Sequence, residues 1–171
     1  MKNIKIKSTL LVLTICGTFL FSCTSKEKTE TKSDEPVITE KQETPKSDTV
    51  RITLNADDKM KYDKSEIRVS EGQTVVLTLH HTGVMPVETM GHNFVLLTQG
   101  TKIPDFANEA IKAKDNHYIP TDGSQIIAHT EQIGGGGTTS ITFKAPAKGE
   151  YDFLCTFPGH WATMKGKFIV E

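Results

Sequence analysis

From Thr49 onward, apolar and polar residues alternate over short segments that are separated by turn-forming residues. This alternation is typical of half-buried β-strands, and the segments are rich in the β-branched residues that strands favour. The expected strands are, in chain order, residues 50–54, 67–69, 74–79, 92–97, 125–129, 139–143, 151–155 and 167–170. About eight short strands with regular turn signals predict an all-β fold, namely an antiparallel Greek-key β-sandwich.

Some segments depart from the alternation. Residues 92–97 are apolar at nearly every position, which is typical of a strand covered on both faces. In residues 104–114 the apolar side chains recur at helical spacing, so one short helical insertion is expected there. Residues 81–89 contain a glycine and a proline and should form a loop. The four glycines at 134–137 lack the spacing of a phosphate-binding loop and are expected to form a flexible turn.

The N-terminus has the organisation of an export signal. Residues 1–7 carry three lysines, and residues 10–21 form an apolar run that is too short to span a bilayer as a stable helix. The run ends in LFSC at residues 20–23, which resembles the cleavage box of bacterial lipoproteins. Residues 1–22 are therefore expected to be a lipoprotein signal peptide, with Cys23 the lipidated first residue of the mature chain. An ordinary signal peptide with an incidental cysteine is the alternative.

A polar segment follows the leader. Residues 24–48 are almost wholly Thr, Ser, Lys, Glu, Asp, Gln and Pro, and they offer too little apolar surface to fold. With Cys23 they form the expected disordered tether, residues 23–48, in front of a folded domain at 49–171. The sequence thus predicts a cell-envelope lipoprotein, held at a membrane by its lipid and facing the periplasm. Because Thr24 is not a retention signal of the aspartate kind, the outer membrane is favoured.

The charge balance argues against nucleic-acid binding, and the cysteine content points to a metal ligand. Twenty Lys and Arg residues balance 21 Asp and Glu residues, so no basic surface for nucleic acid is expected. If Cys16 and Cys23 belong to the leader, the third cysteine, Cys155, has no partner within the chain. A free cysteine is often a small buried hydrophobe, but the residues around Cys155 indicate a metal ligand.

A Cys, a His and a Met follow one another as Cys155-x4-His160-x3-Met164, with a Pro-Gly turn between the first two. His92 lies upstream in the sequence MGHN. A thiolate and two imidazoles in one plane, with a weak thioether on the axis, are the ligands of a mononuclear blue-copper site. These four residues are therefore predicted to bind one copper ion that alternates between Cu(I) and Cu(II). The other histidines are expected to be surface or structural residues: His80, His81, His117 and His129.

Zinc is the chemical competitor, because Cys and His ligands also suit a tetrahedral ion. The chain has no paired ligands of the C-x2-C kind, and the ligand loop offers neither an open position nor a nearby carboxylate. No Ser-His-Asp or Cys-His hydrolase arrangement is supported either. The predicted coordination leaves no position for a substrate, so the protein is not expected to be an enzyme.

The segments around these residues resemble the azurins of the cupredoxin family of blue-copper proteins. The resemblance is carried by CTFPGHWATMKGKFIVE at 155–171, MGHNFVLL at 90–97, IIAHTEQIGGGG at 126–137 and LNADDKMKYDKSEIRV at 54–69. It covers about residues 49–171. It implies an electron-transport protein whose partners are redox proteins, such as cytochrome c or a copper or haem reductase. We expect a monomer.

The resemblance also implies roles for residues beside the ligands. The Gly91 carbonyl would be a distant fifth contact to copper, Asn93 would pin the ligand loops, and Phe157 would lie beside the thiolate. His160 would be an exposed ligand through which electrons pass, within an apolar docking face. The expected docking residues are Met60, Met85, Met90, Phe157, Pro158, Trp161 and Ala162. Trp161 either enlarges this face or packs on the loop.

Three features depart from the family. Its disulfide positions fall on Val50 and Gln73, so that link is missing, and its buried tryptophan is replaced by Phe94. The lipoprotein box and the tether are also unlike the soluble periplasmic form. The first two departures bear on stability and the third on location and partner, and none affects the ligands. The main hypothesis is a one-electron carrier. The alternative is a copper-binding protein for copper delivery or tolerance, which would use more exposed and more exchangeable sites.

Overall fold

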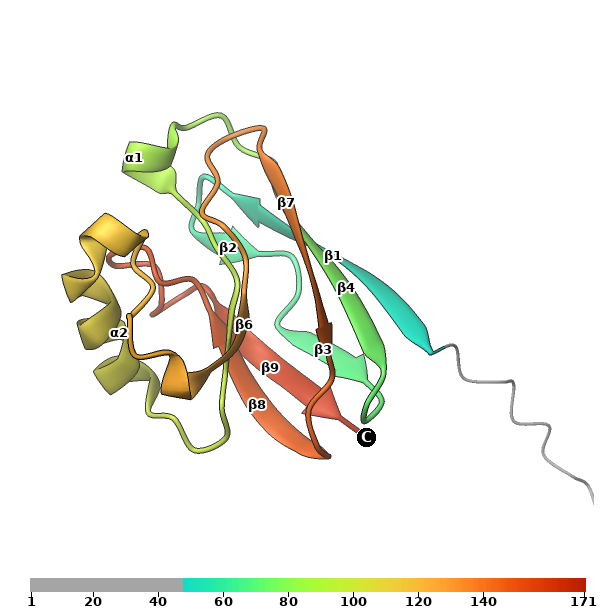
Figure 1. The fold of residues 1–171 in the computed structure, drawn as a ribbon. Helices are drawn as coiled ribbons and strands as arrows, with labels where there is room; N and C mark the ends of the chain where they lie inside the picture. Colours follow the sequence, from blue (N-terminus) through green and yellow to red (C-terminus); the bar gives the residue numbers. More distant parts are fainter. Residues whose placement is uncertain (1–47) are drawn as a thin grey trace, which may run out of the picture. The chain divides into compact units, whose positions relative to one another are not determined.

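The computed structural model describes residues 48–171 (Figure 1). The predicted signal peptide, the lipidation site Cys23 and the tether up to residue 47 lie outside the described residues. Among the helices of the described part, none is long and apolar enough to cross a membrane.

The described strands form two sheets that face each other (Figure 1). One sheet has the spatial order β2 (Lys61–Tyr62), β1 (Thr49–Asp57), β4 (Thr74–His81) and β7 (Thr138–Lys144). The other has the order β3 (Glu66–Val69), β9 (Lys165–Val170), β8 (Gly149–Leu154), β5 (Val95–Leu97) and β6 (Ile126–His129). The prediction of an all-β sandwich is therefore confirmed.

The strand pairing is mixed rather than purely antiparallel. Strand β1 pairs with β4 in parallel, and β3 pairs with β9 in parallel, whereas β4–β7, β5–β8 and β8–β9 are antiparallel. Alternation along a strand shows which face is buried but not the direction of the neighbouring strand. Strand β4 can lie parallel to β1 because the chain between them passes through β3 in the opposite sheet before it returns.

The core lies between the two sheets. Strand β4 alternates as predicted, so that Val75, Leu77 and Leu79 are fully buried. They belong to one cluster with Phe153 and Phe168 of the facing sheet. Complete burial of each such side chain stabilises the fold by roughly 1.5–3 kcal/mol.

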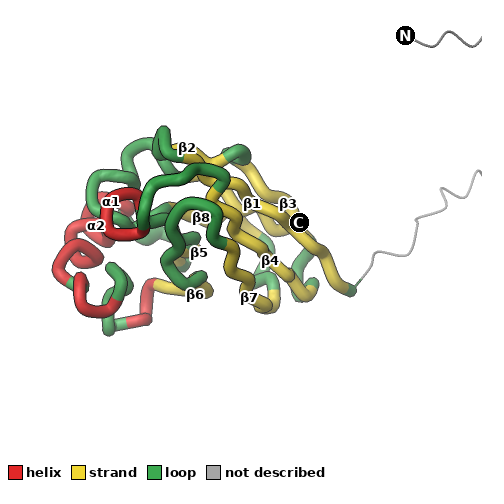
Figure 2. The backbone as a smooth tube through the Cα atoms, turned by 90° about the horizontal axis from the view of Figure 1, so that it is seen from above, coloured by secondary structure: helices red, strands yellow, loops and turns green. Residues whose placement is uncertain are grey.

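Strand β5 is covered on both faces, as its continuous apolar sequence predicted. Leu96 belongs to the cluster between the sheets, whereas Val95 and Leu97 belong to a second cluster with Phe106. Phe106 lies on helix α2 (Ile103–Lys112), which is the predicted helical insertion. Figure 2 shows the helical segments gathered on one side of the strands.

Four short elements were not predicted, and two of them are the 3-10 helices η1 (Lys114–Asn116) and η2 (Gly123–Gln125). Helix α1 (Val87–Met90) is a single turn inside the segment that was expected to be a loop, and it begins after Pro86. Strand β2 has two residues, which is too short for an alternation pattern to be visible. It nevertheless forms a hairpin with the end of β1, with Ala56 opposite Tyr62.

The glycine run at 134–137 is packed against neighbouring backbone, which a flexible turn would not require. The Gly135 amide donates to the Met85 carbonyl at 2.8 Å. A Cβ on Gly134 would lie 2.6 Å from the Val87 nitrogen, and one on Gly135 would lie 2.4 Å from the Val84 carbonyl carbon. These positions need glycine because a side chain would collide with the 84–87 backbone.

We predict that Gly135→Ala lowers the free energy of unfolding by about 1–3 kcal/mol, the usual cost of overpacking. Its matched control is Gly123→Ala, because a Cβ at Gly123 meets nothing within 4 Å. Urea unfolding of both variants and the parent protein measures the difference. Equal midpoints for the two variants would show that the close approach at Gly135 is not a constraint.

Candidate metal centre

Three of the predicted ligands lie together in the described structure. The donor atoms of His92, Cys155 and His160 are all within 4.8 Å of one another. The Cys155 Sγ is 3.7 Å from the His160 Nδ1 and 3.9 Å from the His92 Nδ1. All three side chains are buried. One thiol and two imidazoles thus converge on a single point inside the protein.

The loop between β8 and β9 carries Cys155, His160 and Met164. Cys155 directly follows β8, and Met164 directly precedes β9. The Cys155 amide donates to the Met164 carbonyl at 3.0 Å, and the Met164 amide donates to the His160 carbonyl at 2.8 Å. Gly159 takes a left-handed conformation (φ 84°), which suits the turn between them. The antiparallel β8–β9 hairpin therefore places the three residues in one compact loop.

His92 comes from a distant part of the chain, just before β5. Its backbone forms an isolated bridge with Ile133, with both hydrogen bonds at 2.9 Å. The His92 Nε2 lies 2.9 Å from the Asp57 carbonyl oxygen. Because a carbonyl can only accept a hydrogen bond, this contact places the proton on Nε2 and leaves the Nδ1 lone pair free toward Cys155.

Met164 and Gly91 complete the predicted set. Met164 is fully buried and belongs to the same core cluster as Cys155. The Gly91 carbonyl oxygen lies 3.9 Å from the Cys155 Sγ. A Cβ on Gly91 would lie 2.7 Å from the Val87 carbonyl oxygen and 2.9 Å from the Phe157 ring. Only glycine therefore allows the backbone to approach the thiol so closely.

Asn93 joins the two ligand-bearing segments, as expected for it. Its side-chain oxygen accepts from the Thr156 amide at 2.9 Å, and its Nδ2 donates to the Thr156 hydroxyl at 2.7 Å. Both residues are buried. Phe157 lies beside His160, with ring centroids 4.6 Å apart. Sequence reasoning missed Thr156, although it directly follows the cysteine.

Burial controls the protonation of the metal-free site. It raises the pKa of the Cys155 thiol to about 11 and lowers the pKa of His160 to about 4, with a smaller lowering by His92. Burial also lowers the pKa of His92. At neutral pH the site is thus a neutral thiol and two neutral imidazoles, ready to coordinate once the thiol loses its proton. Soft sulfur and imidazole donors fit copper.

His81 has the structural role that was one of the two expected for it, but its contact with a proposed ligand was not predicted. It was expected to be a surface or structural histidine, and it is fully buried, with its ring packed edge-on against His92 at 4.3 Å between centroids. Its Nε2 lies 3.1 Å from the Asp58 carboxylate. The alternation of β4 could have indicated this, because residue 81 continues the inward series of Leu77 and Leu79.

The predicted docking residues are unequally exposed. Met60 is 37 % exposed and Ala162 is exposed, while the others are half-buried: Met85, Met90, Phe157, Pro158 and Trp161. The expectation that His160 is exposed is wrong, because only 3 % of its surface reaches solvent.

Trp161 packs against the cluster under helix α2. The Lys165 ammonium lies 5.7 Å from its ring centroid. The indole thus stabilises the loop, and its remaining surface lines a cavity of about 450 Å³ with Ile103 and Pro104. The ring thus packs on the protein, which is one of the two roles expected for it, and it also remains partly accessible.

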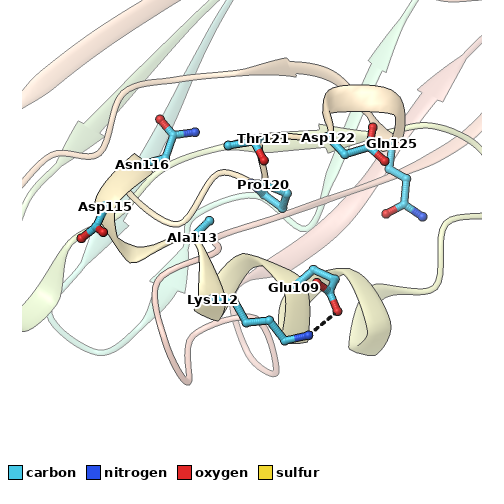
Figure 3. Close-up of a pocket in the computed structure, with 9 residues that line it drawn as sticks. All are labelled: Glu109, Lys112, Ala113, Asp115, Asn116, Pro120, Thr121, Asp122 and Gln125. Carbon is cyan, nitrogen blue, oxygen red and sulfur yellow. Dashed lines mark hydrogen bonds and ion pairs between the residues drawn. The ribbon is translucent and has the colours of Figure 1, made fainter.

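A separate cavity lies at the C-terminal end of α2 (Figure 3). It has a volume of about 780 Å³, and none of the four predicted ligands lines it. Its lining includes an ion pair between Lys112 and Glu109 at 2.7 Å. This cavity is therefore unrelated to the cluster of sulfur and imidazole donors.

Comparisons with known proteins agree with the geometry. Residues 48–171 match the family described as copper binding proteins, plastocyanin/azurin family. An azurin from Pseudomonas fluorescens biotype C is 39 % identical over 125 residues, which are 71 % of this chain and 98 % of the azurin. Outer membrane protein H.8 from Neisseria meningitidis serogroup B is 40 % identical over 119 residues, which cover 67 % of this chain and 64 % of that protein.

Solved structures show the same likeness. Auracyanin A, a "blue" copper protein from Chloroflexus aurantiacus, is 34 % identical with a TM-score of 0.66. The match covers 72 % of this chain and 99 % of the auracyanin. A dithionite-reduced auracyanin from Roseiflexus castenholzii is 38 % identical with a TM-score of 0.65, over 71 % of this chain and 96 % of that one.

We predict that metal binding releases about one proton per copper at pH 7. The thiol, with a pKa of about 11, must lose its proton, whereas both imidazoles are already neutral. The apparent affinity for Cu(I), added without oxygen, should rise roughly tenfold per pH unit between about pH 6 and 9. Proton release in weakly buffered solution measures this. Release of two protons would mean that an imidazole is protonated in the free site.

Proposed function

The chain belongs to the plastocyanin/azurin family of copper-binding proteins, and from this we propose that it is a one-electron carrier with a single blue-copper site. The proposed copper ligands are His92, Cys155, His160 and Met164, with the Gly91 carbonyl as a distant fifth contact. The observation that carries the proposal is the convergence of one buried thiol and two buried imidazole nitrogens within 4.8 Å. The copper ion, when bound, supplies the chemistry by cycling between Cu(I) and Cu(II).

Residues around the proposed ligands hold them in place through hydrogen bonds. The Asn93–Thr156 hydrogen bonds fix the spacing of the two ligand segments, and the Asp57 carbonyl fixes the His92 ring. Ligands that cannot move far keep the two oxidation states similar in geometry, which favours fast electron transfer. Burial excludes water from the site, and four protein ligands leave no position for a substrate. We therefore propose electron transport rather than enzymatic catalysis.

Electrons would enter and leave at His160, the one ligand side chain of the four with any exposed surface. Phe157 packs on its ring, and the half-exposed apolar residues named above as docking residues provide a surface for a partner. We propose that the partners are one-electron redox proteins such as cytochrome c or a copper or haem reductase.

The location of the protein is also a proposal. Residues 1–22 would be removed, Cys23 would carry lipid, and residues 23–48 would tether the domain at 49–171. The match to an outer membrane protein of Neisseria supports a place in the cell envelope, at the outer membrane and facing the periplasm. A monomer on a tether would be free to meet its redox partners.

The test of the site is a titration of the purified protein with Cu(II), followed by visible and EPR spectra. We expect an intense thiolate-to-copper band that saturates at one equivalent, with a small copper hyperfine splitting. Cys155→Ser should abolish the band, whereas His129→Asn, at an exposed histidine, should leave it unchanged. A pale spectrum with a large splitting would contradict the proposal.

The test of electron transfer is stopped-flow mixing of the Cu(II) protein with reduced cytochrome c. Fast oxidation of the cytochrome, one electron per copper, is expected. No fast phase, combined with rapid loss of Cu(I) to a mild chelator, would instead indicate copper delivery or tolerance.

We predict that Cys23→Ser moves the protein from the membrane fraction to the soluble fraction of expressing cells, because the lipid is the proposed anchor. Immunoblots of the two fractions measure the change, and Cys155→Ser serves as the matched control that should stay with the membrane. If Cys23→Ser protein remained membrane-bound, the lipoprotein proposal would be wrong.

A further inference from the structure

The hairpin of β1 and β2 contacts both segments that carry the proposed ligands. The Asp57 carbonyl accepts a hydrogen bond from the His92 ring at 2.9 Å. In the turn that follows, the Met60 carbonyl accepts one from the Thr163 hydroxyl at 3.1 Å. Thr163 lies in the ligand loop, residues 155–164, and directly precedes Met164. The hairpin therefore joins the upstream ligand segment to the ligand loop, although it supplies none of the proposed ligand atoms.

The Thr163 hydroxyl has one proton to donate, and its shorter contact is the one with the Met60 carbonyl. The His160 carbonyl lies further from the hydroxyl, at 3.4 Å. That carbonyl already accepts from two backbone amides of the loop, those of Thr163 at 3.0 Å and Met164 at 2.8 Å. What the side chain of Thr163 adds to the loop is therefore the bond to the hairpin.

The turn that accepts this bond is firmly placed. Met60 has a left-handed backbone (φ 56°), which is uncommon for a residue with a side chain and persists where surrounding contacts hold it. Its amide donates to the Asp57 carbonyl at 3.2 Å. The neighbouring Asp58 carboxylate accepts from the Val84 amide at 2.8 Å. The turn at residues 57–60 is thus anchored to the upstream segments, and the Thr163 hydroxyl attaches the ligand loop to it.

We propose that Thr163 is a positioning residue that latches the ligand loop onto the β1–β2 hairpin and keeps the loop closed over Cys155. The inference rests on the copper site proposed above, because this loop carries three of its four ligand side chains. A one-electron carrier has to retain its metal through many cycles, whereas a copper-delivery protein has to release it. A latch on the ligand loop favours the first role. Ligand spacing does not predict it, because Thr163 lies 103 residues after Met60 in the chain.

The first test is the reactivity of Cys155 in the metal-free protein. This thiol is fully buried, so a thiol reagent reaches it only after the loop or the whole domain opens. Thr163→Val keeps the branched shape but loses the hydroxyl, and labelling of Cys155 should become about twofold to tenfold faster, the range expected for one hydrogen bond. Thr163→Ser keeps a hydroxyl and should restore the parent rate. Mass spectrometry of the peptide that contains Cys155 measures labelling in the full chain.

The matched control is Thr82→Val. Thr82 is also exposed, and its hydroxyl also donates to a carbonyl of this hairpin, that of Ala56 at 2.9 Å. Because Thr82 lies outside the ligand loop, its variant should speed labelling only as far as the whole domain becomes less stable. Urea unfolding of the metal-free variants measures that contribution. If Thr163→Val labelled Cys155 at the parent rate, or no faster than its loss of global stability accounts for, the proposal would be overturned.

The second test uses the copper-loaded protein. Transfer of Cu(I) to a mild chelator should be about twofold to tenfold faster in Thr163→Val than in the parent or in Thr82→Val, while the Cu(II) form keeps its thiolate-to-copper band. Unchanged transfer would show that the loop contact does not retain the metal, which contradicts the role proposed for it. Absence of the blue band in the parent protein would instead refute the copper site itself, and the labelling of Cys155 would still decide whether Thr163 holds the loop.

Discussion

Two hydrogen bonds between Asn93 and Thr156 join segments that are 63 residues apart, and the metal centre depends on them. They form because β5 and β8 are antiparallel neighbours, with Val95 opposite Leu154. In this register the residues just before β5 lie beside those just after β8, which brings His92 and Cys155 together. The strand register is held in turn by the core on both faces of β5. The packing of the sandwich is therefore what sets the distance between the donor atoms.

The depth of the site has an electrostatic consequence. A buried charge without a partner is costly, and the protein avoids it because the metal-free thiol and imidazoles are all neutral near pH 7. The metal-free residues therefore add no uncompensated charge to the core. A metal cation bound there would take the place of the Cys155 proton, so the thiolate would be charged only with a positive ion beside it. This explains how a cysteine, two histidines and a methionine can share a hydrophobic core.

The sequence predicted the local parts of this arrangement well and the long-range parts poorly. The alternation of apolar and polar residues predicted the longer strands, and the spacing from Cys155 to Met164 predicted the ligand loop. Each of these patterns extends over only a few consecutive residues, so it can be recognised in the sequence. The parallel pairing of β1 with β4, the two-residue β2 and the packing of His81 on His92 depend on contacts between distant segments. The turn at the glycine run was predicted, but the need for glycine at 134 and 135 was not, since it comes from the 84–87 backbone. His92 itself was found through its MGHN sequence and not through any local periodicity.

The missing disulfide and the replaced tryptophan lie where core packing and backbone hydrogen bonds stabilise the fold. Val50 packs against the core, and the Gln73 side chain accepts a hydrogen bond from the Ser70 amide while its carbonyl accepts from the Ala145 amide. The parallel ladder between β1 and β4, which pairs Val50 with Val75, fixes this end of the sheet without a disulfide. Phe94, which replaces the family's tryptophan, is fully buried and packs against Phe153. The Phe153 ring also packs on Tyr62. The three rings therefore form one row from the core to the β1–β2 hairpin, and the Asp57 carbonyl of that hairpin holds the His92 ring, so core packing and the position of a proposed ligand are linked through the hairpin.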